Sequence, residues 1–599
     1  MLKIKTVAAI LAIGLFVINT GFSKTATVED NWNDYLHYTK IGRLDVAAGY
    51  AQAVLDGNPD PVQLLTFSEK NQQGYAILLK VVESAPDAKL AELSKKILAI
   101  IEQGRFIRRT DPKIIVEEVK RLTGTERGRM TAVKRLQNAG EYSIMYMLEA
   151  LADESRKDEA ANIIWALPQV GRDSLRPLAV ALQSKNVPIK AEIIRAMGKI
   201  GYPQSLAYLK YVVEKDDSNE LRGLAEQSIK QIDESALNVS AAEQFYNLGE
   251  EYYYHGQSLK PAEDANFANV WFWDAEKQQL SREKVNKDYF YELMAMRQCE
   301  WALKADAGFG QAIGLWLASY FKAESAGAPM PTYFGQGHAD ALVYATTAGP
   351  EYLHQALARA IKDDNAYVAL GAVEALAITA GEKSLLYRLG IAQPLLQALS
   401  FKDRAVRYSA AIAIAAAGPK NDFAESKLVT ENLAQAIAKT AGDANDTKNL
   451  WNDSIADSYA LRAAQAMLKL AQTRNAVINL SGAQNALIDA TKDTRAEIRI
   501  LAGEILAYLT SPDAQRAIAA MALAEGNPKD IRISAFNSLA VSAKFNANLL
   551  DNDMINAIYT LLGSKDADPQ LRSAAAAAYG AFNLPSQKVK DLILDQSKS

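Results

Sequence analysis

The chain has 599 residues, of which 49% are hydrophobic and 23% charged, so it can bury a large apolar interior and is not compositionally disordered. Its 33 Gly and 18 Pro are few for this length, which excludes collagen-like and loop-rich proteins. The net charge of −4 lacks the basic excess of a nucleic-acid binder, and one Cys with four His cannot supply a disulfide framework or a Cys-based zinc site.

Residues 1–23 have the layout of a secretory signal peptide. Lys3 and Lys5 precede a short apolar run, Val7–Val17, and small residues follow up to Ser23. The run is shorter than the roughly 20 residues that a helix needs to cross a bilayer. We therefore expect an exported protein of bacterial type, periplasmic or extracellular, with no integral membrane span after cleavage.

From Asn31 onward, apolar residues recur at helical spacing, which predicts a nearly all-α protein. Its length exceeds what one globular core supports, so we expect several domains or a repeating solenoid. The first helical region, 24–125, contains an aromatic residue, a helix-ending Gly, a small residue and a Pro at Tyr38, Gly42, Ala47 and Pro59. This pattern resembles a tetratricopeptide (TPR) hairpin.

A short signature recurs further along the chain. It consists of an apolar residue, Arg, two variable residues and Ala, at the start of a predicted helix that follows a polar turn. Its five clear copies contain Arg222, Arg407, Arg499, Arg532 and Arg572. The copies near the C-terminal end are spaced by about one antiparallel helix pair, as in a helical repeat protein.

The signature resembles that of HEAT repeats. One unit runs from the apolar stretch 393–399 through Asp403 and Arg407 to Gly418. The resemblance covers about 126–238 and 336–599 and implies an α-solenoid in which a turn Asp and a helix Arg link neighbouring units. It implies this role for three pairs: Asp403 with Arg407, Asp493 with Arg499, and Asp568 with Arg572. Small Ala faces and the planar donor fork of Arg fit such packing.

The segment 239–335 differs from its flanks because it is rich in aromatic residues. Its first helix, around Phe245–Tyr252, again resembles the opening of a TPR-like hairpin. Near 269–285, two segments that contain apolar residues flank a turn-like stretch, Ala275–Gln278. This pattern predicts a small β-hairpin inserted between helices.

We select six aromatic residues of this segment as candidate protein-binding residues. They are Tyr252, Tyr253, Trp271, Phe272, Trp273 and Trp301. Large rigid rings with a polar edge suit a recognition surface, and they equally suit the core of a thick junction between two solenoid arms. The sequence leaves both interpretations open.

Motifs of the common enzyme classes are absent from the sequence: it has no Gly-rich phosphate loop, no nucleophile elbow and no His-Glu-x-x-His. We therefore expect no enzymatic activity, no cofactor and no metal. Glu251 and His255 are four residues apart, so on one helix face they would form an incomplete metal site, an acid–base pair or a plain surface hydrogen bond. The lone Cys299 is expected to be a buried small hydrophobe.

Together these features predict an all-α solenoid of HEAT-like and TPR-like hairpins. We expect a non-catalytic scaffold or assembly factor that binds protein partners, not nucleic acid, through the concave face of stacked helices. One alternative is a structural component of a cell-envelope assembly that self-associates. A further alternative is a small-ligand carrier or enzyme that uses the aromatic segment.

Overall fold

A computed structural model describes residues 26–84, 86–262, 265–335, 337–438 and 451–597. In these residues the chain is an all-α solenoid with one two-stranded β-sheet, formed by β1 (Phe267–Asp274) and β2 (Gln279–Asn286). The predicted fold class and the inserted hairpin are confirmed. The predicted signal peptide, 1–23, lies outside the described residues.

Contacts along the chain define two compact units. The first holds residues up to Ile200 together with Phe272–Ser281, and the second holds Gly201–Trp271 and the residues from Arg282 onward. The tip of the β-hairpin therefore belongs to the first unit and its base to the second. The predicted domain limits, 24–125, 126–238, 239–335 and 336–599, stay predictions.

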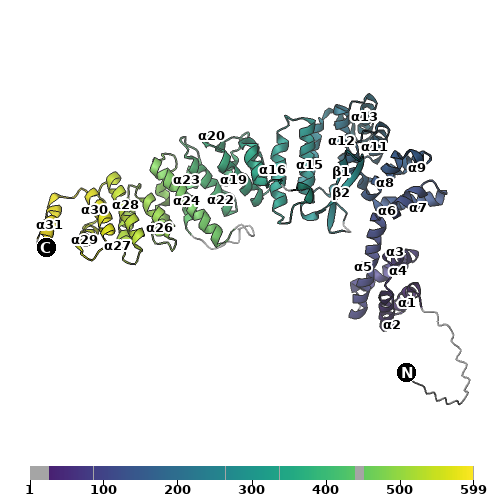
Figure 1. The fold of residues 1–599 in the computed structure, drawn as a ribbon, viewed down its shortest axis with the longest axis horizontal. Helices are drawn as coiled ribbons and strands as arrows, with labels where there is room; N and C mark the ends of the chain where they lie inside the picture. Colours follow the sequence, from purple (N-terminus) through teal and green to yellow (C-terminus); the bar gives the residue numbers. More distant parts are fainter. Residues whose placement is uncertain (1–25, 85, 263–264, 336, 439–450, 598–599) are drawn as a thin grey trace, which may run out of the picture. The chain divides into compact units, whose positions relative to one another are not determined.

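The first unit consists of helices in close succession, of which α5, with 23 residues, stands out in Figure 1. Its helices are α1 (Val28–Lys40), α2 (Leu44–Asp56), α3 (Pro61–Lys70), α4 (Gln72–Ser84), α5 (Ala88–Thr110), α6 (Pro112–Arg121), α7 (Glu126–Ala139), α8 (Glu141–Ala152), α9 (Ala160–Ala166), α10 (Leu175–Ala181) and α11 (Val187–Ile200). Capping residues determine where several of these helices begin. Asp60 and Asp111 each accept a backbone N–H of the first turn, and a Pro follows each Asp at a helix position that needs no donor.

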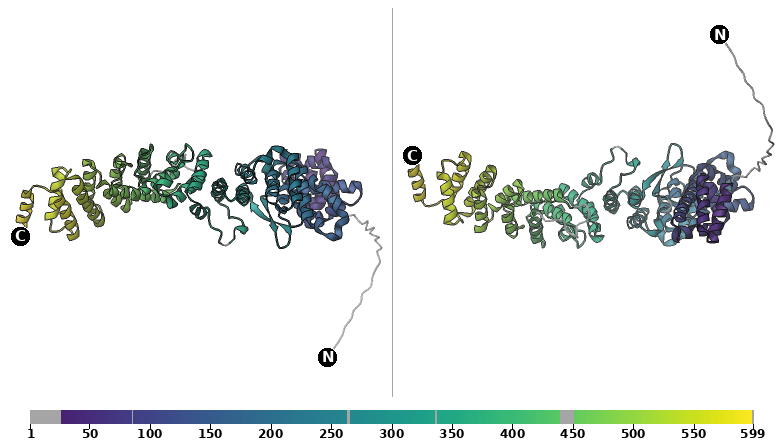
Figure 2. Two further views of the ribbon diagram at one scale, coloured as in Figure 1. Left: turned by 90° about the horizontal axis from the view of Figure 1, so that it is seen from above. Right: turned by 90° about the horizontal axis from the view of Figure 1, so that it is seen from below.

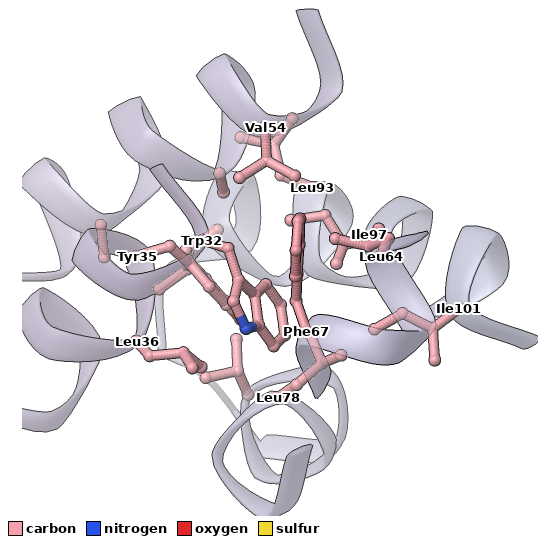
Figure 3. Close-up of a cluster of buried hydrophobic side chains, with 14 of the residues drawn as sticks. Trp32, Tyr35, Leu36, Val54, Leu64, Phe67, Leu78, Leu93, Ile97 and Ile101 are labelled. Atoms are coloured by element: carbon pink, nitrogen blue, oxygen red, sulfur yellow. The ribbon is translucent and has the colours of Figure 1, made fainter. Parts of the chain in front are cut away.

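The N-terminal helices share one core around Trp32. Figure 3 shows Trp32 and Tyr35 of α1 packed with Leu64 of α3 and Ile97 of α5, and all four side chains are almost completely buried. The hydroxyls of Tyr35 and Ser94 lie 3.0 Å apart and satisfy each other inside this core. The core therefore joins helices that are far apart in the sequence.

Two glycines fit the backbone around this core. Gly42 has a φ of +79° in the turn between α1 and α2, which pack together as the predicted hairpin with Ala47 fully buried. Gly104 of α5 lies against the start of α3, and a Cβ added there would overlap the backbone carbonyl of Pro61. The crossing of α3 and α5 therefore requires a residue without a side chain.

The second unit continues the helical repeats. Its helices are α12 (Leu206–Lys215), α13 (Asn219–Asp233), α14 (Ala241–Tyr253), α15 (Phe290–Ala305), α16 (Gln311–Glu324), α17 (Ala341–Ala348), α18 (Pro350–Lys362), α19 (Ala366–Thr379), α20 (Glu382–Leu385), α21 (Pro394–Ala398), α22 (Arg404–Ala417), α23 (Ser426–Ile437), α24 (Asp453–Thr473), α25 (Gln484–Ala490), α26 (Ala496–Leu506), α27 (Pro512–Leu523), α28 (Lys529–Asn546), α29 (Asn552–Gly563), α30 (Pro569–Ala581) and α31 (Ser586–Ser597). Figures 1 and 2 show α22 to α30 stacked in chain order. Within this stack α24 packs on α26, α26 on α28 and α28 on α30.

The recurring signature marks the second helix of these pairs. Its five Arg residues lie near the starts of α13, α22, α26, α28 and α30. The Ala three residues after each Arg is buried in every copy, namely Ala225, Ala410, Ala502, Ala535 and Ala575. Because a buried Ala lets a neighbouring helix approach closely, the structure confirms the predicted Ala-based helix packing.

Candidate binding surfaces

Three of the six candidate aromatic residues lie in the interior of the second unit. Tyr252 and Tyr253 end α14 and are 4% and 1% exposed, and Trp271 on β1 is 3% exposed. The backbone oxygen of Trp271 also accepts a hydrogen bond of 2.7 Å from Arg297. Because a buried ring cannot contact a partner, the core interpretation is favoured for these three residues.

Trp301 of α15 belongs to an aromatic cluster where α12, α14 and α15 meet. Its ring stacks on Phe245 with centroids 5.8 Å apart, and it meets Tyr208 and Tyr211 edge to face with centroids 6.2 and 5.2 Å apart. The Lys304 ammonium lies 4.7 Å from the ring centroid. Trp301 therefore holds three helices together, and its partly buried ring offers a partner little free surface.

Phe272 and Trp273, the last two candidates, lie at the end of β1 that belongs to the first unit. Both side chains are partly buried. The turn after them is formed by Asp274, which accepts backbone N–H groups from Glu276 and Lys277 at 3.0 Å each. The fold thus places only these two of the six candidates at the hairpin tip.

The hairpin tip and the helices of the first unit enclose a surface groove of about 420 Å³, which we call the hairpin groove. Its walls include Met145, Leu148 and Glu149 of α8, Ile189 and Ile193 of α11, and Trp273 and Leu280 of the hairpin. The backbone N–H of Lys185 donates to the Gln278 side-chain oxygen at 3.2 Å, which fixes the tip next to these helices. The groove is largely apolar and preformed.

Glu149 is the distinctive charge of the hairpin groove. Although it remains solvent-exposed, burial by the surrounding walls raises the pKa of its carboxyl. Among the described residues its carboxylate has no hydrogen-bond or ion-pair partner, whereas Lys277 on the hairpin pairs with Asp274 at 3.4 Å. The indole N–H of Trp273 is also buried without a partner in the described part of the chain. No motif marks Glu149 in the sequence, and its one distinguishing feature there is that it is the single carboxylate within the apolar run 142–152.

His255 does not share a helix face with Glu251. α14 ends at Tyr253, and His255 has a φ of +54°, so the spacing of four residues has no helical meaning here. Its Nε2 instead lies 2.6 Å from Oε1 of Glu292, and the Lys322 ammonium lies 3.1 Å from the same oxygen. Glu292 is 2% exposed, whereas the His255 side chain is 45% exposed, so the cluster pairs one buried carboxylate with two more accessible side chains.

Opposing effects act on Glu292. Burial alone would raise the pKa of its carboxyl, but the hydrogen bond from His255 and the charge of Lys322 outweigh burial and hold the pKa below its usual value.

Cys299 is fully buried as expected, and burial raises the pKa of its thiol. In the described residues no group of three or more His, Cys, Asp and Glu is arranged to hold a metal ion.

Polar contacts do link neighbouring repeat units. Asp493 pairs with Arg495 at 2.7 Å, and the same guanidinium reaches Asp457 at 3.1 Å and the backbone oxygen of Ile437 at 3.0 Å. Arg499 donates to Asn527 at 2.9 Å. The inter-unit role expected of Arg499 is therefore shared with Arg495, which the signature did not mark.

The other predicted linking residues make mostly local contacts. Arg407 donates to the backbone oxygens of Phe401 and Lys402 in its own turn. Arg222 donates to the backbone oxygen of Asp216, Arg532 to that of Ala522 and Arg572 to that of Ser564. Asp403 and Asp568 cap α22 and α30, and Asp568 also binds Lys529 of the preceding unit at 3.2 Å. The proposed Asp–Arg pairings stay predictions.

Comparison with known proteins supports the repeat assignment in part of the chain. A family profile for HEAT repeats matches residues 144–230, which span α8 to α13 and include the first copy of the signature. No curated protein matches the sequence. None of the described helices is long and apolar enough to span a membrane.

Similar solved structures include an engineered protein, which is 16% identical with a TM-score of 0.22 over 85% of this chain and 98% of that chain. They also include importin beta, at 12% identity and a TM-score of 0.27 over 95% of this chain and 79% of that chain. A structure of Kap121p bound to Pho4p is 13% identical, with a TM-score of 0.25 over 94% of this chain and 58% of that chain. At such TM-scores the likeness carries no conclusion about function.

Proposed function

We propose that the protein is an exported, non-catalytic scaffold that binds a protein partner, and that the hairpin groove is one of its contact sites. The observation that carries the proposal is the groove itself, in which a β-hairpin lies beside α8 and α11 and supplies Trp273 opposite apolar helix walls. Export rests on the layout of residues 1–23 and stays a prediction.

The chemistry of the hairpin groove suits a protein segment. Its apolar walls would bury apolar side chains, and the Glu149 carboxylate, which no described residue pairs, would accept a Lys or Arg from the partner. Trp273 supplies the large rigid ring that commonly dominates binding energy at protein interfaces. The helices hold these groups in place before binding, so little ordering entropy is lost.

Capture of partners from the exported fraction by the tagged, folded full chain tests the proposal. We expect Trp273→Ala to reduce capture of a specific partner about tenfold or more, since aromatic hot spots commonly contribute 2 kcal/mol or more. Trp165→Ala is the matched control, because Trp165 of α9 is an exposed tryptophan of the same unit outside the groove. Equal capture by both variants, or no partner for the folded wild type, would contradict the proposal.

Export itself is tested by cell fractionation followed by N-terminal sequencing of the exported protein. We expect the mature chain to begin just after Ser23, because signal peptidases cleave behind small residues. A chain that keeps its first residues and stays in the cytoplasmic fraction would contradict this part of the proposal.

Self-association is a second candidate function, which one observation favours. Val589 and Ile593 lie four residues apart on α31 and are 43% and 63% exposed, so they form an apolar stripe on one helix face. Light scattering over a concentration series would show a rise in mass that Ile593→Ser abolishes. A constant monomer mass up to high concentration would exclude this candidate.

A further inference from the structure

A second groove, of about 480 Å³, lies on the stacked helices α24, α26 and α28, and we call it the C-terminal groove. The residues that matter here are Leu468 of α24, Glu504 and Tyr508 of α26 and its end, and Asp530, Ile533 and Val541 of α28. Ile533 and Val541 are eight residues apart on one helix, which corresponds to about 12 Å. The groove is therefore long enough for two turns of a partner segment.

Among the described residues that line the C-terminal groove, two are charged, and both are carboxylates, Glu504 and Asp530. Asp530 lies in the first turn of α28, where the helix dipole favours its negative charge. Glu504 lies partly buried in the middle of α26, and burial raises the pKa of its carboxyl. The Glu504 carboxylate has no hydrogen-bond or ion-pair partner among the described residues, so its charge lacks compensation.

Three basic side chains of the same helices are engaged elsewhere. The Lys469 ammonium donates to the backbone oxygen of Ala416 at 2.6 Å, and Arg499 donates to Asn527 at 2.9 Å. Lys529 pairs with Asp568 at 3.2 Å. The groove thus combines apolar side chains and uncharged polar ones with a negative potential that these three basic residues of the same helices do not neutralise. The uncharged polar residues that line it are Gln472, Ser534, Asn537 and Ser538.

We infer that the C-terminal groove binds a segment of a partner protein that presents one Lys or Arg side chain between apolar side chains. The cation would pair with Glu504, with Asp530 at the edge and the Tyr508 ring beside it, while the flanking apolar groups would pack on Leu468, Ile533 and Val541. Acidic segments and nucleic acids are disfavoured, because their charges would face two carboxylates. This inference rests on the proposed scaffold function and adds a second site with a stated preference.

Three synthetic peptides test the inference on the full chain. They share one amphipathic helical sequence and differ at a single position in the middle of the apolar stripe, which is Arg, Gln or Glu. Fluorescence anisotropy should show that the Arg peptide binds at least tenfold more tightly than the Gln peptide, with the Glu peptide weakest, because the ion pair forms in a partly desolvated site.

Variants of the groove carboxylates locate this binding. Glu504→Gln should weaken binding of the Arg peptide about tenfold and leave the Gln peptide unchanged, and Asp530→Asn should have a smaller effect in the same direction. Glu525→Gln is the matched control, because Glu525 is exposed in the turn after α27 and lies outside the groove. Circular dichroism verifies that each variant is folded.

Several results would overturn the inference: no binding of any peptide, equal affinity for all three, or unchanged Arg-peptide affinity in both groove variants. Hydrogen exchange that becomes slower in α26 and α28 as the concentration of the chain alone rises would identify a second copy as the occupant, which also overturns it. Because these variants leave the hairpin groove intact, partner capture that depends on Trp273 would still support the scaffold function.

Discussion

Replacing Trp301 with Ala should destabilise the junction of α12, α14 and α15 and should not act as the loss of a binding contact. The Trp301 ring touches Phe245, Tyr208 and Tyr211, so its removal leaves a cavity lined by three aromatic rings. Trp→Ala changes in cores typically cost 3–5 kcal/mol, and the partial exposure of Trp301 places the expected loss near the lower limit, about 3 kcal/mol.

Hydrogen exchange is the suitable assay, because stability in a repeat protein is local. A loss of about 3 kcal/mol corresponds to amide exchange about a hundredfold faster in α14 and α15, while α26 to α30 should be unaffected. Trp273→Ala serves as the comparison, since Trp273 lines a groove. We expect at most tenfold faster exchange around its hairpin.

The core assignment would be refuted if Trp301→Ala left exchange in α14 and α15 within about threefold of the wild type. It would also be refuted if the variant lost partner binding at unchanged stability. Either result would mean that the ring serves a surface function that its contacts with Phe245 and the two tyrosines do not indicate.

Three further predictions follow from particular contacts. Glu292→Gln should lower the free energy of unfolding by about 3 kcal/mol at pH 7, because it removes the charged partner of Lys322. The pKa of Glu292 is lowered on folding, so the difference in melting temperature between this variant and the wild type should shrink as the pH falls towards 3. Gly104→Ala should lower the free energy of unfolding by about 1–3 kcal/mol, and with it the melting temperature, despite the better helix propensity of Ala. Gly223→Ala should raise the melting temperature, because a Cβ at this position meets nothing within 4 Å. Arg495→Lys should speed hydrogen exchange in α24 to α26, since a single ammonium cannot replace the guanidinium contacts to Asp493, Asp457 and Ile437; unchanged exchange would contradict the linking role.

The regular part of the fold was predictable because it depends on local periodicity. Ala535 and Ala575 follow their signature Arg residues on helices that begin where the polar turns predict, and both are buried. The hairpin near 269–285 was also readable, because two runs flank a turn whose Asp274 caps its own backbone. Each of these features is determined by residues that are close together in the sequence.

The candidate sites could not be predicted in the same way, because they depend on contacts between residues that are far apart in the sequence. Glu251 and His255 looked like a helical pair, but the helix ends between them and His255 meets Glu292 of a later helix. The aromatic candidates shared one composition, yet Tyr253 lies in the interior and Trp273 lines a groove. Packing between helices that are distant in the sequence decides which side chains are buried and which line a groove.

The sequence by itself determined the helical class, the repeat signature and the insertion of a hairpin, because hydrophobic periodicity and turn chemistry act over a few residues. Tertiary structure alone decided which aromatic rings form the core, which charges are paired, and which carboxylates, those of Glu149 and Glu504, have no partner within the described part of the chain. The physical reason is that burial and charge compensation are properties of the assembled helices, whose neighbours lie tens of residues apart along the chain.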